Sequence, residues 1–393
     1  MKIGVLTLYG ANYGCALQTL AVMKTYESLG LEPLLIPDET HNGIKVTHQK
    51  QNMLSKLTPS YITSVIRVRT KRKYDLKNQH DNLLREIINH KVNSRKYSEL
   101  KAARKTVFSE FYKNNINHAD FSINLKNIPT NRLSQFDLFS IGSDQVWNPT
   151  YPETSEIKFL TFANENQKVS FAPSFGISEL PDFTKEHYKK WLNAFPMISV
   201  REERGAQIIK ELTGKDATVI CDPTMTIRKK EWEAVEAKPS FDTSKPYALT
   251  YFLGNESNKY RKYINKVAKE KGLSVINLFD LREPEHYAAG PAEFIYLIHH
   301  SDAVFTDSFH AAVFSIIFKK DFVVFDRIED GRSMGSRLKT LLSKFEFSDR
   351  MFSSICKDNF TKVDFSNTDK ILEQERNNAL NFLRKNINHN LGN

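Results

Sequence analysis

The segment Ile3-Gly4-Val5-Leu6-Thr7-Leu8 is a short apolar run, and it is followed, after three further residues, by Asn12-Tyr13-Gly14. A run of this length predicts a buried strand, and the small and polar residues after it are able to face a ligand. The pattern recurs as residues 136–141 before Gly142-Ser143-Asp144-Gln145 and as residues 303–306 before Asp307-Ser308-Phe309-His310. Ligands bind at the carboxyl ends of strands in a helix-covered parallel sheet, so the three segments predict a binding cleft.

Length and composition indicate a protein with two hydrophobic cores. The chain has 393 residues, of which 40% are hydrophobic, which is more than one ordinary domain core needs. A mean hydropathy of -0.46 and the lack of an apolar run approaching about 18 residues predict a soluble protein. The first apolar run is expected to be a strand rather than a signal peptide. The three cysteines, Cys15, Cys221 and Cys356, share no metal-binding spacing, so we expect a reducing cytoplasmic location and no zinc or other metal site.

Strand-like and helix-like segments alternate along the chain, which predicts mostly parallel sheets. The expected strands are residues 3–8, 32–36, 136–141, 168–171, 197–200, 218–221, 247–252, 274–278, 303–306 and 322–325, and the main expected helices are residues 15–29, 203–212, 257–271, 291–299, 309–318 and 369–385. A polar segment at 238–245 separates two such series. We therefore expect an α/β protein with Rossmann-like domains at 1–237 and 246–350, and a helix within 366–393 that packs back on the first domain. Two Rossmann-like domains that face a cleft form the glycosyltransferase-B architecture.

The positive charge of the chain is concentrated in a predicted helical insertion at about 60–115. Between Arg67 and Lys113 there are fourteen basic and five acidic residues, which accounts for nine of the ten net positive charges. Apolar residues recur there at helical intervals, which predicts basic amphipathic helices. These helices either present an ordinary solvated face or contact an anionic partner, such as a membrane surface or a diphosphate-linked lipid. Nucleic acid is not an expected partner, because the stretch contains no groove-reading motif.

Five short motifs lie at or beside the expected strand ends. They are Asn12-Tyr13-Gly14-Cys15-Ala16-Leu17-Gln18, Ile141-Gly142-Ser143-Asp144-Gln145-Val146-Trp147-Asn148-Pro149, Ile198-Ser199-Val200-Arg201-Glu202-Glu203, Cys221-Asp222-Pro223-Thr224 and Thr306-Asp307-Ser308-Phe309-His310. In this order they resemble the polysaccharide pyruvyltransferase family, from Ile3 to about Leu342. Each motif alone is weak, but the series of five is specific.

The resemblance implies a reaction as well as a fold. The family transfers the enolpyruvyl carbons of phosphoenolpyruvate to two hydroxyls of one sugar, which yields a pyruvate ketal and phosphate. Its fold resembles glycosyltransferase-B, and it implies no metal or organic cofactor. We expect a cytoplasmic enzyme of surface polysaccharide or capsule biosynthesis that acts on a polyprenyl-diphosphate-linked oligosaccharide. The basic helices would then hold it at the inner face of the membrane as a peripheral protein.

Phosphoenolpyruvate carries a carboxylate and a phosphate, so its pocket needs cationic donors and helix amino termini. The resemblance makes Arg201 a substrate-binding arginine, although an ion pair with Glu202 or Glu203 would also explain its position. It places the phosphoenolpyruvate-binding histidine at His310, in the first turn of a predicted helix. A protonated imidazole there could bind phosphate or deliver a proton as a catalytic acid. A purely structural histidine is the alternative.

The chain departs from the family at two positions beside His310. Ser308 stands where some members carry arginine, and Ala311 stands where glycine commonly follows the histidine. Another cation must then supply the missing guanidinium, or the pocket is weaker. The arginines nearby in sequence are Arg327, Arg332 and Arg337. We expect Arg337 to take this role, with Ser308 and Phe309 completing the phosphoenolpyruvate site.

Ketal formation also requires a group that accepts protons from the sugar hydroxyls. Asp144 is the expected catalytic base or acceptor-binding residue, and Asp307 is the second choice. Either could instead be a helix cap or a turn residue. The expected acceptor-binding residues are Asn12, Tyr13, Gly14, Ser143, Gln145 and Trp147. Gly14 would let the backbone approach a ligand closely and Trp147 would stack on a sugar, but a turn glycine and a core tryptophan are equally compatible with the sequence.

Two other functions fit the same architecture. One is a glycosyltransferase that uses a nucleotide sugar, for which the sequence offers no clear base-and-ribose motif. The other is a non-catalytic binding protein of the same fold, which the departures at Ser308 and Ala311 leave open.

Overall fold

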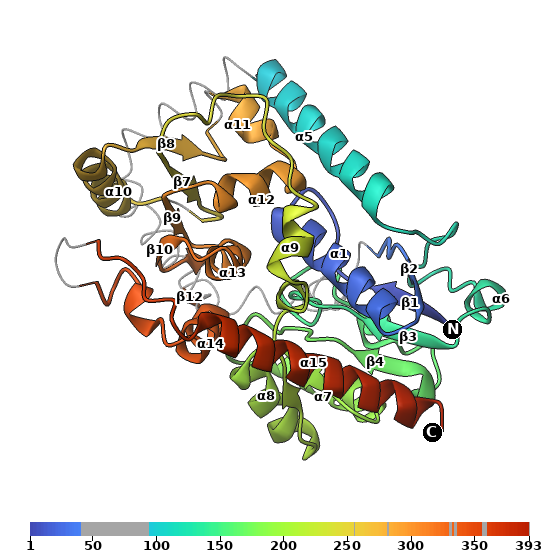
Figure 1. Ribbon diagram of the computed structural model, residues 1–393. Helices are drawn as coiled ribbons and strands as arrows, with labels where there is room; N and C mark the ends of the chain where they lie inside the picture. The colour runs from blue at the N-terminus through green and yellow to red at the C-terminus, as the bar shows by residue number, and fades with distance from the viewer. Residues whose placement is uncertain are drawn as a thin grey trace, which may run out of the picture.

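Two four-stranded parallel sheets organise the protein, one in each half of the chain (Figure 1). The computed structural model describes residues 1–40, 94–254, 256–280, 283–329, 332–333, 336–355 and 360–392. The first sheet has the order β2-β1-β3-β4 and consists of β1 (Lys2–Leu6), β2 (Glu32–Leu35), β3 (Leu138–Ile141) and β4 (Lys168–Ser170). The second has the order β10-β9-β7-β8 and consists of β7 (Tyr247–Tyr251), β8 (Ser274–Asn277), β9 (Ala303–Thr306) and β10 (Asp321–Val324). All strand pairs in both sheets are parallel, which confirms the predicted α/β class.

In each sheet, the first strand in chain order lies inside the sheet, and the next two strands lie on opposite sides of it. β1 lies between β2 and β3, and β7 lies between β8 and β9. Connections on the two sides of such a switch point diverge at the carboxyl ends of the central strands, and ligands bind there in open parallel sheets. The segments that follow β1, β3 and β9 are the three that the sequence singled out.

Helices cover both sheets (Figure 1). In the first half they are α1 (Tyr13–Ser28), α5 (Ser94–Asn115), α6 (Thr130–Leu133), α7 (Asp182–Asn193), α8 (Glu203–Thr213) and α9 (Lys229–Glu233), with the 3-10 turns η2 (Glu156–Phe159), η3 (Glu165–Gln167) and η4 (Pro223–Met225). In the second half they are α10 (Asn258–Lys271), α11 (Pro284–Ala288), α12 (Pro291–His299), α13 (Phe309–Ile317), α14 (Ser336–Lys344) and the turn η5 (Ser348–Arg350), and α15 (Thr368–Asn390) follows them. The short strands are β5 (Ser199–Val200), β6 (Thr218–Val219), β11 (Ile328–Glu329) and β12 (Arg332–Ser333). None of the helices within the described ranges has the length and hydropathy of a membrane span.

The predicted basic insertion at about 60–115 lies partly outside the described residues, and its described part is α5. Within α5, Lys105 and Lys113 are exposed, but Arg104 is buried. The Arg104 guanidinium lies 4.5 Å from the centre of the Tyr13 ring and donates a hydrogen bond of 2.8 Å to the Tyr287 carbonyl oxygen. One of the fourteen cations is therefore part of the interior rather than of a charged surface.

Side-chain caps set the start of the two helices that matter most for the site. The Asn12 side chain accepts a hydrogen bond from the Cys15 N–H at the start of α1. Ser308 does the same for the Ala311 N–H at the start of α13, at 3.4 Å. Each cap satisfies a backbone donor that the helix itself leaves unpaired. Both helix amino termini are thereby fixed next to the strand ends that precede them.

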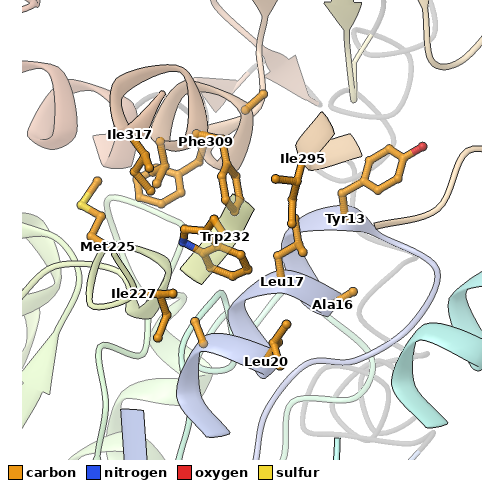
Figure 2. Close-up of a cluster of buried hydrophobic side chains, with 14 of the residues drawn as sticks. Tyr13, Ala16, Leu17, Leu20, Met225, Ile227, Trp232, Ile295, Phe309 and Ile317 are labelled. Carbon is orange, nitrogen blue, oxygen red and sulfur yellow. The ribbon is translucent and has the colours of Figure 1, made fainter. Parts of the chain in front are cut away.

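A continuous hydrophobic core joins the two halves (Figure 2). Leu17 and neighbouring residues of α1 face Ile295 of α12 and Phe309 of α13 across this core. Trp232 of α9 is fully buried between them, with its indole N–H donated to the Thr224 carbonyl oxygen at 3.0 Å. The halves are therefore packed directly on each other in this region.

The last helix, α15, runs along the first half after the chain has left the second (Figure 1). The Asn390 amide donates to the Lys168 carbonyl oxygen of β4 at 2.9 Å, while Glu375 near the start of α15 pairs with Lys344 of α14 at 2.6 Å. α15 thus contacts both halves of the molecule. Its buried face includes Leu383, which is 0% exposed.

Replacing this buried leucine tests whether α15 is part of the stable fold. We expect Leu383→Ala to lower the free energy of unfolding by about 2–5 kcal/mol, because it removes a fully buried side chain and leaves a cavity. Lys385→Ala, on the exposed face of the same helix, should change it by less than about 0.5 kcal/mol. Urea unfolding followed by circular dichroism gives both values. Equal effects of the two substitutions would contradict the packing described above.

Candidate active site

Five charged side chains from the two halves converge in one buried cluster. Asp144, Arg201 and Asp222 belong to the first half, and His310 and Arg337 belong to the second. All five are classed among the buried residues, and none is more than 8% exposed. Charges that are removed from water in this way must compensate one another.

Local backbone structure places each member of the cluster. Asp144 follows β3 with a positive φ of 65°, which is uncommon for a residue other than glycine, and its carbonyl oxygen accepts the N–H groups of Val146 and Ser174. Arg201 follows β5 directly, and Asp222 caps the turn η4 by accepting the Thr224 N–H at 3.0 Å.

The two members from the second half lie in the first turns of helices. His310 is the second residue of α13, directly after the Ser308 cap, and Arg337 is the second residue of α14. The amino terminus of a helix favours anions because its N–H groups are unpaired there. Both residues therefore contribute a side chain at a point where the backbone already attracts negative charge.

The carboxylates link the cations across the two halves. Arg201 donates to Asp222 Oδ2 at 2.6 Å from Nη1 and to Asp144 Oδ1 at 3.1 Å from Nη2. The other two contacts cross between the halves: Arg337 Nη1 lies 3.5 Å from Asp144 Oδ1, and His310 Nε2 lies 3.6 Å from Asp222 Oδ2. Each carboxylate therefore faces Arg201 of its own half and one basic side chain of the other half, which is Arg337 for Asp144 and His310 for Asp222.

The electrostatic environment keeps both carboxylates ionised. Burial raises the pKa of Asp144, but the positive charges of Arg201, His310 and Arg337 outweigh it and hold the pKa below its usual value. Burial likewise opposes ionisation of Asp222, and His310 and Arg201 lower its pKa well below the ordinary range. Burial and the nearby Arg201 charge lower the pKa of Arg337. Asp144 and Asp222 therefore act as fixed negative charges rather than as neutral hydrogen-bonding groups.

Three buried nitrogen atoms in the cluster have no hydrogen-bond partner among the described residues. They are Nε of Arg201, Nε of Arg337 and Nε2 of His310. Phe309 lies beside both guanidinium groups, with its ring centre 4.5 Å from Arg201 Cζ and 5.9 Å from Arg337 Cζ. Buried polar atoms are nearly always paired, so unpaired buried nitrogens within one cluster indicate a place for an acceptor-rich ligand.

Three of the residues predicted to bind the acceptor, Asn12, Gly14 and Ser143, lie at or near the cluster. A Cβ atom on Gly14 would be 2.2 Å from His310 Nδ1, so only glycine lets α1 pack against the imidazole. Ser143 Oγ lies 3.2 Å from Asp222 Oδ2, and Asn12 caps the helix that contains Gly14. The structure therefore brings Gly14 and Ser143 together with the clustered residues, and Asn12 lies at the start of the helix that contains Gly14.

Three other predicted acceptor residues serve packing instead. Trp147 is fully buried and stacks on Phe159 at 5.2 Å, so the core alternative describes it and stacking on a sugar does not. The Gln145 side chain is 5% exposed and accepts a hydrogen bond from Asn148 at 2.8 Å. Tyr13 is also fully buried, and its hydroxyl donates to the Ala289 carbonyl oxygen at 2.7 Å. Their sequence positions were compatible with a site, but their side chains point into the interior.

Asp307, the second choice as a base, holds a neighbouring loop. Its carboxylate accepts the Leu253 N–H at 2.7 Å and the Gly254 N–H at 2.8 Å. Burial raises its pKa, while these two hydrogen bonds oppose the rise. The residue therefore shapes the turn after β7. Arg332 was another candidate for the role expected of Arg337, but its side chain is not among those that the structure describes.

Sequence reasoning did not assign a role to Asp222 or to Cys15. Asp222 stood in a quoted motif, and its position between a strand end and a proline was the available signal. Cys15 Sγ lies 3.7 Å from Asp144 Oδ2, and burial, followed by the Asp144 charge, raises the pKa of the thiol well above its usual value. The thiol therefore stays protonated and acts as a weak donor to Asp144.

The hollow beside the cluster is small. It is bordered by Arg201, Asp222, Phe309 and Arg337 among others and measures about 20 Å³. That volume holds about one water molecule. A hollow of this size is not an open cleft.

Together, the fold and the cluster define a class: an α/β protein in which two parallel-sheet halves enclose a buried charged site at their strand ends. The sequence matches the polysaccharide pyruvyl transferase family over residues 12–328. The chain belongs to this family and is a transferase.

Comparisons of structure give only distant likenesses. The UDP-GlcNAc 2-epimerase from Neisseria meningitidis shares 11% identity with a TM-score of 0.38, over 95% of this chain and 99% of that one. The corresponding enzyme from Methanocaldococcus jannaschii shares 10% identity with a TM-score of 0.41, again over 95% and 99%. A spinosyn rhamnosyltransferase shares 8% identity with a TM-score of 0.34, over 100% and 96%. No curated protein sequence matches the chain.

The lowered pKa of Asp222 predicts how stability depends on pH. An unfolded aspartate has a pKa of about 3.9, so the stabilisation by folded Asp222 is fully present above about pH 5 and is lost as the pH falls toward its lower folded value. Asp222→Asn leaves the buried Arg201 guanidinium without this partner. The substitution should lower the free energy of unfolding by about 3–5 kcal/mol at pH 7. The difference in the free energy of unfolding between variant and wild type should decrease as the pH falls from about 5 to 3.

Urea unfolding at a series of pH values measures this difference. Asp216→Asn is the matched control, because the Asp216 side chain is 92% exposed and pairs with Lys210 at the surface. The difference in unfolding free energy between Asp222→Asn and wild type could instead stay constant or increase on acidification. That result would show that the carboxylate is not held ionised by its neighbours.

Proposed function

We propose that the protein transfers the pyruvyl group of phosphoenolpyruvate to two hydroxyls of a sugar, forming a pyruvate ketal during surface polysaccharide biosynthesis. The observation that carries this proposal is the meeting of Arg201, Arg337 and His310, contributed by both halves, in a single buried cluster. Family membership supports the same reaction. The acceptor sugar is proposed to be carried on a polyprenyl diphosphate.

The cluster has the donors that phosphoenolpyruvate requires. A guanidinium binds a carboxylate or phosphate through two parallel hydrogen bonds, and two guanidinium groups flank the Phe309 ring here. Arg337 takes the place of the arginine that some family members carry at the position of Ser308. Ser308 itself caps α13 and thereby fixes the position of His310.

Substrate entry requires the cluster to rearrange. A hollow of about 20 Å³ is too small for phosphoenolpyruvate, and the contacts of Asp144 with Arg337 and of Asp222 with His310 occupy groups that the substrate would need. The substrate anion would replace Asp144 at Arg337 while the two halves move apart. Asp222 would remain on Arg201, because their contact lies within one half.

The proposed chemistry assigns His310 and Asp144 to proton transfers. His310 donates a proton to C3 of phosphoenolpyruvate as the first sugar hydroxyl bonds to C2 and gives its proton to Asp144. The bond between C2 and the phosphate oxygen then breaks, and the leaving phosphate takes the proton from Asp144. The second hydroxyl bonds to C2 and gives its proton to the neutral imidazole of His310, which restores its starting state. Asp144 is a weak base while Arg337 faces it, since that charge lowers its pKa. Movement of Arg337 to the substrate would make Asp144 a better proton acceptor.

The acceptor side is proposed to lie at the amino terminus of α1. Asn12, Gly14 and Ser143 border the cluster there. The exposed Lys105 and Lys113 of α5 would contact an anionic membrane surface, which attracts each basic residue by about 1 kcal/mol.

Binding of phosphoenolpyruvate should stabilise the protein by mass action. At a concentration about 100 times its Kd, a ligand of the native state adds about 2.7 kcal/mol of stability, so the melting temperature should rise. Arg201→Lys should abolish the rise, because lysine cannot form the guanidinium fork. Arg204→Lys is the matched control, since Arg204 pairs with the exposed Glu211. Stabilisation by UDP-GlcNAc and not by phosphoenolpyruvate would favour a glycosyltransferase instead.

Replacement of the histidine tests the proton-transfer step. We expect His310→Gln to lower kcat by about 10²–10⁴-fold, the usual contribution of general acid catalysis. The measurement is phosphate release from phosphoenolpyruvate with a panel of hexosides as acceptors. His187→Gln, an exposed histidine on α7, should leave the rate unchanged. A His310→Gln enzyme with wild-type kcat would remove the histidine from the mechanism.

A further inference from the structure

A second cluster of ionisable side chains lies where the chain passes from α9 to the second half. It consists of Glu236, His299 and His300, whose ligand atoms all lie within 4.8 Å of one another. Glu236 follows α9, and the two histidines end α12. We propose that these three residues bind a divalent transition-metal ion of the Zn²⁺ type, which would clamp the interdomain linker to the second half.

The distances suit a single shared ion. Glu236 Oε2 lies 2.9 Å from His299 Nδ1, and Glu236 Oε1 lies 3.3 Å from His300 Nε2. Ligands at about 2.0–2.2 Å from a tetrahedral zinc ion are separated by a little more than 3 Å, so small shifts would accommodate the ion. Two imidazoles and one carboxylate favour zinc and similar transition metals over Mg²⁺ or Ca²⁺, which prefer oxygen ligands.

Aromatic packing fixes both imidazole rings before any ion binds. The His299 ring stacks on Phe318 with centres 4.4 Å apart, and the His300 ring stacks on Tyr296 at 4.0 Å. Side chains that are already held in position lose little freedom on binding, which strengthens a metal site. The carboxyl-terminal end of α12, where both histidines lie, also favours a positive charge.

A further carboxylate lies behind one of the ligands. Glu233 Oε1 is 3.7 Å from His299 Nε2, the ring nitrogen that does not face Glu236. Metal-binding histidines usually donate this second N–H to a carboxylate, which fixes the tautomer and increases the basicity of the ligand. Lys229 also pairs with Glu233, at 3.6 Å, and remains compatible with this role.

The backbone around Glu236 is anchored on both sides. Trp232 is fully buried, with its ring 5.0 Å from that of Phe314 in α13. The N–H of Ala237 donates to the Ala292 carbonyl oxygen of α12 at 3.1 Å. The carboxylate is therefore held next to α12 by structure independent of the histidines. The site contains no cysteine, which is why cysteine spacing did not indicate it.

Zinc titration of the untagged protein tests the proposal. We expect wild type to bind Zn²⁺ by isothermal titration calorimetry with a raised melting temperature that EDTA reverses, and MgCl₂ to have no such effect. His300→Ala and Glu236→Gln should each weaken zinc binding at least about 100-fold, and Glu233→Gln should weaken it about tenfold. His187→Ala, with an exposed histidine outside the cluster, should bind as wild type does.

Replacement of His300 should change zinc affinity without destabilising the fold. The His300 side chain is 43% exposed, so its replacement should leave the melting temperature without metal close to that of wild type. Equal zinc affinity in wild type and in a His299→Ala/His300→Ala double variant would overturn the proposal. Because the measurements use neither phosphoenolpyruvate nor activity, they stand apart from the test of the transferase function.

Discussion

The burial of an ionised Asp222 between Arg201 and His310 is the constraint on which the rest of the structure depends. A carboxylate that is 1% exposed is tolerable only where cations compensate it. Arg201 comes from a strand end of the first half and His310 from a helix of the second, so full compensation is reached only when the halves are packed together. The shared core and the close approach of Gly14 to the imidazole occur at the same contact. Charge and apolar packing thus favour the same closed arrangement.

Much of the fold could be predicted because its signals are local. The strand expected at 303–306 is β9 (Ala303–Thr306), and the helix expected at 15–29 is α1 (Tyr13–Ser28), which begins earlier because Asn12 caps it. The position of Asp144, Arg201 and His310 close after strand ends was also predictable, since ligand-binding residues follow the carboxyl ends of strands in parallel sheets. The three strands belong to different sheets, so the packing of these sheets brings the residues together. The alternation of strand-like and helix-like segments predicted the fold, and the polar residues after the strands predicted the site.

The remainder depends on the direction of side chains, which local patterns do not specify. Trp147 and Tyr13 follow strands just as the site residues do, yet both turn into the core and are 0% exposed. Arg104 belongs to a basic run but lies against Tyr13 in the interior. Asp222 is a structural cap and a charge partner at once. Only the packing of the two halves decides which of these side chains reaches the cluster.

The course of α15 has a consequence for how the halves can separate. The chain crosses between the halves after α9 and again before α15, and the first-half segments that adjoin these crossings are in contact: Arg228, just before α9, has its Nη2 3.1 Å from Glu373 of α15, and Arg376 Nε of α15 donates to the Thr226 carbonyl oxygen at 3.0 Å. A pair of adjoining crossings can act as a pivot. The molecule would therefore open like a clamshell, by rotation about this edge, and the displacement would increase with distance from it rather than be the same everywhere.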